Sequence, residues 1–410
     1  MIPPVLRENR NFRRYFVGQL VSLLGDQVTT IALPLTAVLA LHASPGQMGA
    51  LLTVSLVPNL LFSLHAGVWV DRSGQRRRVM LVSDVLRGLL TGTIPLAYAL
   101  GQLSWPLLYI VSFLIGTVTV FFYVAYGGFF QAVVPRKDYV EANSLIHGSR
   151  AFSFVAGNSL GGILVQIFRG PYALGLDAIT FIWSAFFLGR IDVEEPPGSD
   201  PEAGGLRAGM RWIRDNAIIR AELLGVATLN LFNFMFSTLI ILYATRSLDV
   251  SPASLGIVFG AASVGTLSGS FVTGRIARRI GVGPTFIAGC FLFPAPLVLM
   301  PLAGGPHWLV LALLFVAEFT SGVGLMLLDI MAGTISAATV PAQLRSRVSG
   351  AFMVVNYGVR PLGTTLGGVL GSVLGVRPTL FIGAVGALLG LAWLLPSPIP
   401  RLKELDEHPA

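Results

Sequence analysis

Long apolar runs alternate with short polar connections along the whole chain. Most of these runs contain about 20 residues or more, which is the length that a helix needs to cross a bilayer. Because backbone polar groups must be satisfied internally in lipid, we expect helices, and the runs are far too long for barrel strands. The pattern predicts an all-α polytopic membrane protein with twelve transmembrane helices, over residues 14–41, 47–70, 79–101, 105–133, 143–168, 172–190, 221–245, 253–275, 284–303, 308–337, 348–373 and 379–396.

Composition supports this interpretation and excludes other classes of protein. The 410 residues are 54% hydrophobic and 12% charged, whereas a soluble domain carries about 25% charged residues. The net charge of +8 does not indicate nucleic-acid binding, because the arginines lie between the apolar runs and form no separate basic domain. The single Cys290 and the five scattered histidines give no disulfide and no metal-ligand spacing. With no nucleotide-binding Gly-Lys-Ser/Thr loop, we expect neither an enzyme nor a cofactor.

The charges in the connections orient the chain. Connections at 42–46, 102–105 and 304–307 are nearly neutral, whereas arginines and lysines gather at 7–14, 71–78, 136–137, 191–220, 275–279, 345–347 and 401–403. By the positive-inside rule the basic side is cytoplasmic. We therefore expect a multi-pass protein of the bacterial cytoplasmic membrane with both termini in the cytoplasm, and the first long helix as its uncleaved insertion signal.

One long polar stretch divides the chain. It predicts a bundle of six helices at 1–190, a cytoplasmic linker at 191–220, a second six-helix bundle at 221–398 and a cytoplasmic tail at 399–410. The first part of the linker, from Glu194 to Gly205, is typical of a flexible segment. Its second part places Leu206, Met210 and Ile213 on one helical face, which predicts an amphipathic helix lying on the inner leaflet.

The two halves repeat in register. Residues 6–9 resemble 213–216, and Gly74 matches Gly281, at a common offset of 207 residues; Val134-Pro135 matches Val340-Pro341 at 206. A repeat preserved over six spans predicts two similar bundles related by an axis along the membrane normal. Such an arrangement leaves a site between the halves near the midplane, which rocking would expose to each side in turn.

The connection between the second and third spans carries a signature. The pattern Gly-x-x-x-Asp-Arg-x-Gly-x-Arg-Arg resembles the cytoplasmic-loop motif of the major facilitator superfamily, and the matching residues are Gly67, Asp71, Arg72, Gly74, Arg76 and Arg77. Stretches at 13–33, 134–143 and 358–363 resemble the multidrug branch of that superfamily, which holds macrolide and siderophore exporters. The resemblance covers essentially the whole chain.

A fourth stretch resembles the antiporter motif of drug exporters. It contains Gly157, Asn158, Gly161 and Gly162, with Asn158 where that motif has a proline. Small residues that let two helices approach closely explain the glycines equally well.

The acid of the loop motif distinguishes the two halves, because Arg278 occupies the position that matches Asp71. A carboxylate is favoured at a helix N-terminus, and the resemblance implies that Asp71 caps the eleventh helix near Ser349 and Gly350 in the outward-facing state. Asp84 and Arg87, three residues apart on one helix, are expected to form a neighbouring ion pair and to belong to the same cytoplasmic gate. The alternative is that these charges only fix topology and anchor the loop.

Charges at membrane depth are costly and therefore candidates for function. Asp26 lies halfway along the first span, with Asn233 as its repeat mate, and is the first candidate for binding a proton or a cationic substrate. The alternative is an acid paired with a buried arginine. Glu318 and Arg360 are the next candidates for coupling, either as a pair or separately.

Two further predictions concern charged residues in the membrane. Arg150 and Asp177 form another candidate pair. Asp329 lies near the cytoplasmic end of its span and is assigned to the inner gate.

The expected cavity lining is apolar and aromatic with a few amides, which suits a bulky amphiphile better than a sugar; helix packing is the alternative for each member. The candidates are Asn59, Tyr123, Tyr126, Gln131, Asn230, Phe232, Asn233, Phe236, Asn356 and Tyr357.

The sequence therefore predicts a monomeric secondary exporter of drug-like amphiphiles, driven by the proton gradient through alternating access. The alternatives are a siderophore or metabolite exporter and, from another class, a non-transporting receptor, scaffold or scramblase.

Overall fold

The computed structural model describes residues 3–195 and 205–403, and within these ranges all regular structure is helical. A short α1 (Pro4–Glu8) precedes the first span. The spans of the first half are α2 (Arg10–Ala40), α3 (Pro45–Ser73), α4 (Arg76–Ala99), α5 (Trp105–Val133), α6 (Tyr139–Phe168) and α7 (Gly170–Gly189). Those of the second half are α9 (Ala217–Arg246), α10 (Pro252–Ile280), α11 with α12 (Val282–Leu292, Leu299–Leu302), α13 (His307–Thr339), α14 (Arg345–Val373) and α15 with α16 (Val376–Ala387, Leu391–Leu394).

These helices confirm the predicted spans. Within the described ranges, eleven helices or helix pairs are long and apolar enough to cross a membrane. The twelfth, α14, has 29 residues but includes Arg345, Arg347 and Arg360, which make it less apolar.

The repeat in the sequence is also a repeat of local structure. Asn9 accepts a hydrogen bond from the backbone N–H of Phe12 (2.8 Å) and so caps α2, and Asn216 caps α9 through Ile219 N–H (3.0 Å). Such a side chain satisfies a donor that the helix itself leaves unpaired. The matched glycines also agree, because Gly74 and Gly281 both have positive φ, at 61° and 97°.

Two compact units make up the chain. Of the described residues, unit 1 contains 3–43, 54–195 and 251–256, and unit 2 contains 44–53, 205–250 and 257–403. The first turns of α3 therefore belong to unit 2, and the first turn of α10 belongs to unit 1. The predicted division at residues 190 and 221 did not include this exchange.

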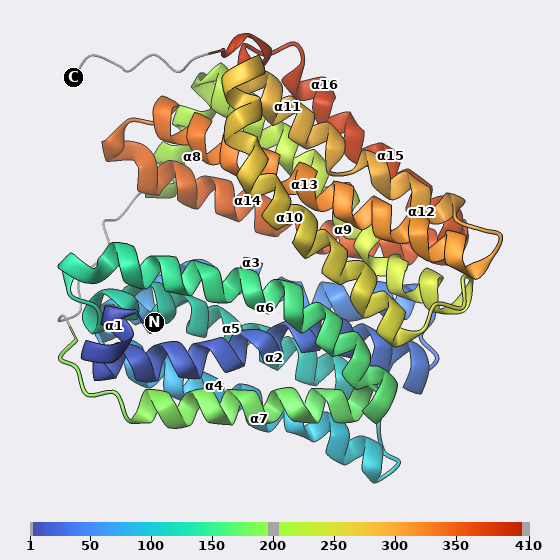
Figure 1. The fold of residues 1–410 in the computed structure, drawn as a ribbon, viewed down its shortest axis with the longest axis horizontal. Coiled ribbons are helices and arrows are strands. Elements are labelled where there is room, and N and C mark those ends of the chain that lie inside the picture. The colour runs from blue at the N-terminus through green and yellow to red at the C-terminus, as the bar shows by residue number, and fades with distance from the viewer. Residues whose placement is uncertain (1–2, 196–204, 404–410) are drawn as a thin grey trace. The chain divides into compact units, whose positions relative to one another are not determined.

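In unit 1 the long helices lie side by side, with α7 packed along both α2 and α4 (Figure 1). One end of this bundle has a dense aromatic core. Phe12, Tyr15 and Phe129 are at most 1% exposed, and the Tyr15 and Phe129 rings lie 5.9 Å apart, edge to face.

Unit 2 is built around α9, which packs against α14 and α15, while α11 packs along α13. The linker helix α8 (Gly205–Asp215) packs on α14, and Ile213 is 2% exposed within the unit 2 core. The expectation that the apolar face of this helix rests on the inner leaflet is therefore corrected for Ile213 and the half-buried Leu206, which contact protein, while Met210 is exposed.

Candidate functional site

A buried ionic network lies inside unit 1. Asp84 and Arg87, one turn apart on α4, form an ion pair in which neither side chain is exposed. The second guanidinium nitrogen of Arg87 lies 3.5 Å from Asp26 on α2, whose side chain is 23% exposed. Asp26 is therefore the member of this network that protein atoms do not fully enclose.

Aromatic rings complete the surroundings of Arg87. Its guanidinium carbon lies 4.0 Å from the centroid of the Phe122 ring and 4.3 Å from that of Phe181. The Tyr123 hydroxyl donates a hydrogen bond to Asp26 (3.3 Å). Cation–π contacts are strongest where water is excluded, so the rings and the two acids together hold the cation in a fixed place.

A third acid lies close to the network on α7. Asp177 is 1% exposed and accepts hydrogen bonds from the Thr29 and Thr180 hydroxyls, the latter at 2.8 Å. The predicted partner Arg150 instead lies over the Tyr126 ring, 5.1 Å from its centroid. Asp177 is thus held by hydroxyls, and the candidate ion pair between Arg150 and Asp177 does not form.

The positions of these groups create an excess of negative charge. Asp26 and Asp84 are paired with the guanidinium of Arg87 at membrane depth, and Asp177 is close enough for the charges of Asp26 and Arg87 to act on it. Each uncompensated charge in such a place is costly. Uptake of a proton by this group of acids would lower the cost, and Asp26 is the acid whose side chain protein atoms enclose least.

In unit 2 the predicted coupling residues are arranged differently. Arg360 lies over the rings of Tyr357 (4.8 Å) and Phe234 (5.1 Å), and the acid whose charge acts on it is Asp329. Glu318 forms no hydrogen bond or ion pair with any described residue. The candidate pair between Glu318 and Arg360 is therefore absent from this structure, and Glu318 is a half-buried acid without a partner in the described ranges.

The predicted cavity residues divide into a buried group and a group that is half-buried or exposed. Phe236 and Tyr126 are buried, at 2% and 8% exposed; Phe236 packs against Gly383 and Tyr126 lies among other aromatic rings, so both contribute to helix packing. Asn230 and Asn356 are half-buried, and a hydrogen bond from Asn230 to Asn356 (2.7 Å) links α9 to α14. The other half-buried or exposed members are Asn59, Tyr123, Gln131, Phe232, Asn233 and Tyr357.

A cavity of about 820 Å³ opens elsewhere in unit 1, among α3, α4 and α5. Its wall is mostly apolar and aromatic, with Trp69, Leu86 and Phe121, and it has polar groups from His65 and Arg78. Pockets of this size and lining hold drug-sized ligands. None of the residues predicted to line a cavity lies here, because the sequence does not show which faces of three neighbouring helices diverge.

The signature at residues 67–78, named here the Asp71 loop, comprises the last turns of α3, the two connecting residues Gly74 and Gln75, and the first turn of α4, so less of it is irregular than the sequence predicted. Gly74 adopts φ 61°, a backbone conformation that favours glycine, whereas nothing lies within 4 Å of a Cβ added at Gly67. The Asp71 carboxylate is paired with Arg76 (3.2 Å) and is about half exposed. In the described part of unit 1 the acid is thus held by its own loop.

The beginning of α4 is capped by Glu195, which the sequence pattern placed in the flexible linker. The Glu195 carboxylate accepts hydrogen bonds from the backbone N–H groups of Arg76 (2.6 Å) and Arg77 (3.0 Å). Arg77 also donates to the Ile191 carbonyl, and Asn11 donates to that of Asp192 (2.7 Å). Residues 191–195 are therefore tied to unit 1, and residues 196–204 lie outside the described ranges. The signal available in the sequence was that α4 begins without a capping side chain of its own.

The glycines that resemble an antiporter motif lie at close helix contacts. A Cβ at Gly157 would overlap the Gln27 side chain, and one at Gly161 would lie 3.1 Å from the Val28 Cα, so both glycines bring α6 close to α2. Asn158 is 7% exposed, and Gly162 approaches Gly256 at the start of α10. This geometry agrees with the packing interpretation of the motif.

Comparison with known sequences gives consistent matches over nearly the full length. The sequence profile of the Major Facilitator Superfamily matches residues 15–364 and, in a second match, 223–410. The multidrug efflux pump Tap of Mycolicibacterium fortuitum is 26% identical, with 93% of this chain and 94% of Tap covered. The enterobactin exporter EntS of Citrobacter koseri is 23% identical, with 95% and 92% covered.

Comparison with solved structures supports the same fold. A bacterial homologue of the iron transporter ferroportin, in an inward-facing state, superposes with a TM-score of 0.75 at 16% identity, covering 94% of this chain and 98% of the other. A bacterial homologue of the human lysosomal transporter Spinster gives a TM-score of 0.74 at 15% identity, with 96% of each chain covered. At these identities the likeness shows the fold alone.

Proposed function

Because this chain belongs to the major facilitator superfamily of membrane transporters, which are not enzymes, we propose that it is a secondary active exporter of amphiphilic small molecules that exchanges them for protons. Transport of small substrates across a membrane follows from the family. The substrate class, the proton and the direction are the proposal.

Proton coupling is supported above all by the position of Asp26. It shares Arg87 with the fully buried Asp84, yet its own side chain is 23% exposed. When ionised, Asp26 is paired with Arg87 and Tyr123. When protonated, it weakens its hold on Arg87, which keeps Asp84 as its partner. One proton thus changes the attachment of α2 to α4 without leaving Arg87 unpaired, as a coupling residue requires.

The remaining predicted residues are assigned within the same cycle. Glu318, without a partner in the described ranges, is a second proton acceptor, and Arg360 is a candidate for binding an anionic part of the substrate. The Asp71 loop serves as a cytoplasmic gate that opens and closes during alternating access. The pairing of Asp71 with Arg76 supplies a partner for the acid whenever it is not capping another helix.

An amphiphilic substrate is supported by two observations. The 820 Å³ cavity of unit 1 combines aromatic walls with His65 and Arg78. The relative Tap is named a multidrug efflux pump, and EntS is named an enterobactin exporter, so siderophore export is the second candidate. Accumulation assays in a deletion strain, with dyes and macrolides in one arm and siderophores in the other, separate the two. The family match favours transport over the receptor, scaffold or scramblase alternative.

We also propose that the protein is a monomer. Both of its termini are placed in the cytoplasm, since the basic connections then face inward. Labelling of single cysteines introduced at the two ends of unit 1, in intact cells and in open membranes, tests this orientation.

The central experiment is the Asp26→Asn variant in proteoliposomes with a pH-sensitive dye inside. An asparagine keeps a hydrogen-bond acceptor for Tyr123 and Arg87 but cannot take up a proton. We expect substrate-dependent proton movement to disappear while the protein remains folded. Asp215→Asn, at an exposed acid on α8, is the matched control and should behave as the wild type. Unchanged transport with unchanged pH dependence in Asp26→Asn would eliminate Asp26 as the coupling residue.

A further inference from the structure

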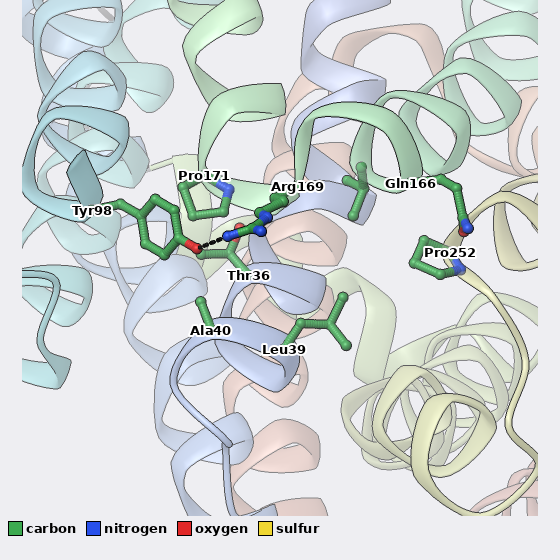
Figure 2. Close-up of a pocket in the computed structure, with 10 residues that line it drawn as sticks. Thr36, Leu39, Ala40, Tyr98, Gln166, Arg169, Pro171 and Pro252 are labelled. Carbon is green, nitrogen blue, oxygen red and sulfur yellow. Dashed lines mark hydrogen bonds between the residues drawn. The ribbon is translucent and has the colours of Figure 1, made fainter. Parts of the chain in front are cut away.

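A second cavity lies at the end of unit 1 that is remote from the Asp71 loop. From Arg76 to Tyr98, α4 rises about 33 Å at 1.5 Å per residue, which is the thickness of the hydrocarbon core. The cavity measures about 350 Å³ and is formed where the ends of α2, α4 and α6 meet the starts of α7 and α10 (Figure 2). We name it the Arg169 pocket; its lining includes Thr36, Leu39, Tyr98, Gln166, Arg169 and Pro171.

Arg169 stands out at this end by its charge. In the described connections at this end of unit 1, residues 41–43, 100–104 and 169, it is the only Arg, Lys, Asp or Glu. The positive-inside rule disfavours a cation on the outer side, which is where the proposed orientation places this end. A charge retained against that preference needs a local reason.

The backbone and the neighbouring rings hold Arg169 toward the pocket. The residue lies between α6 and α7 with φ 68°, a backbone conformation that residues other than glycine rarely adopt. Its guanidinium donates to the Tyr98 hydroxyl (3.2 Å), as Figure 2 shows, and the Tyr98 ring meets the Tyr172 ring edge to face at 5.6 Å. This hydrogen bond raises the pKa of Arg169 above its ordinary value, so the side chain stays charged.

The guanidinium retains donors for a ligand. An arginine has five N–H donors in a planar fork, and the contact with Tyr98 is the one hydrogen bond that Arg169 makes through its side chain to any described residue. A planar fork with free donors matches a phosphate or a carboxylate.

The surface beside the pocket indicates where such an anion comes from. Leu96 on α4 and Leu100, the residue that follows this helix, are 61% and 63% exposed, and Leu39 and Tyr172 are 43% and 44% exposed. Tyrosines at the end of a membrane helix lie at the headgroup level, with apolar residues below them. A ligand with an anionic group at the guanidinium and an apolar chain along α4 satisfies both features.

We propose that the Arg169 pocket binds the phosphate group of an anionic phospholipid from the outer leaflet, with Arg169 as the cation and the Tyr98 ring and hydroxyl as its positioning partner. The assignment to the outer leaflet rests on the proposed orientation, whereas phospholipid binding itself does not depend on transport or on the direction of transport.

The test measures lipid retention by the full-length protein. Purified protein is exchanged into mixed micelles with phosphatidylglycerol, and bound lipid is counted by native mass spectrometry across a titration. Arg169→Gly removes the cation and accepts φ 68° without strain, so it should fold. We expect its affinity for phosphatidylglycerol to fall roughly 10- to 100-fold, the range for a lost charge-assisted hydrogen bond. Tyr98→Phe should lower the affinity less, since the guanidinium remains.

Controls test whether the lost affinity belongs to this pocket. Arg246→Ala, at an exposed arginine ending α9, should retain the wild-type affinity. An equal loss in Arg246→Ala would show a non-specific charge effect and overturn the proposal, as would unchanged retention in Arg169→Gly. If free inorganic phosphate competes as well as the lipid does, a soluble anion is the occupant and the phospholipid is refuted. Cysteine labelling at residue 169 reports the orientation separately, and a cytoplasmic result would reassign the leaflet but not the binding.

Discussion

Replacing Arg87 by methionine removes the cation from the buried network of unit 1 while keeping a side chain of similar length. Asp84 then has no ionic partner, and neither Asp84 nor Arg87 is exposed, so water cannot take the place of the guanidinium. Breaking a buried ion pair by removing one partner costs about 3–5 kcal/mol. Asp26 adds less to this cost, because its side chain is 23% exposed and its contact with Arg87 is long, at 3.5 Å.

The sign of the pH dependence follows from proton counting. In folded Arg87→Met the buried carboxyl groups are tolerated best when protonated, whereas in the unfolded chain they are ionised at about pH 8. The folded variant therefore binds more protons than the unfolded chain, and its stability falls as the pH rises. The wild type, in which Arg87 neutralises the acid, should change less over the same range.

The measurement is an SDS titration followed by tryptophan fluorescence, at about pH 5.5 and about pH 8. A loss of 3–5 kcal/mol corresponds to about two to three and a half orders of magnitude in the ratio of folded to unfolded protein. The triple variant Asp26→Asn, Asp84→Asn, Arg87→Met removes the charges of these three side chains and should recover much of the stability. Its pH dependence should be smaller than that of Arg87→Met but should not disappear, because the buried Asp177 remains. If Arg87→Met unfolds like the wild type at both pH values, the buried network does not stabilise unit 1, and the predicted loss is refuted.

Two further predictions concern the Asp71 loop. Gly74→Ala should destabilise the protein by about 1–2 kcal/mol, because its φ of 61° disfavours a Cβ. Gly67 has a helical backbone and open space around it, so Gly67→Ala should be neutral or stabilising by up to about 1 kcal/mol. Thermal unfolding compares the two variants, and equal losses of stability would contradict the geometry. Glu195→Gln should speed amide hydrogen exchange at the first two residues of α4, since the cap weakens by about 1 kcal/mol, and the exposed Glu194→Gln is the control; exchange unchanged in both variants would show that the cap is dispensable.

The sequence was sufficient for features that depend on local chemistry. Hydrophobic runs predicted the spans, because length and composition alone decide which helices can cross a bilayer. The repeat predicted that Asn9 and Asn216, and Gly74 and Gly281, would have equivalent roles, and the structure shows the same caps and the same positive φ. Such features involve residues a few positions apart.

Features that depend on helix rotation could not be predicted in the same way. Asp84 and Arg87 were expected to pair because one helix turn joins them, but the approach of Asp26 to Arg87 depends on how α2 faces α4. For the same reason the sequence left open whether Arg150 pairs with Asp177 and Arg360 with Glu318. Neither pair forms, and each guanidinium lies on aromatic rings that were not identifiable as partners from the sequence. Glu195 was missed because its composition resembles a linker, and its role comes from a helix start more than a hundred residues earlier.

The pairing of Asp84 with Arg87 within one helix also bears on how the protein is made. A translocon inserts helices largely one at a time, and each charge at membrane depth adds about 2.5–3.5 kcal/mol to insertion. Since α4 carries both members of its ion pair, it enters the bilayer with no net charge from them, before any neighbour has arrived. Asp26 on α2 has no such partner in its own helix, and its ion pair forms only after α4 has brought Arg87 into the bilayer. During biogenesis α4 is therefore the helix that secures the first span, and the order of synthesis leaves α2 with an uncompensated acid until the third span is in place.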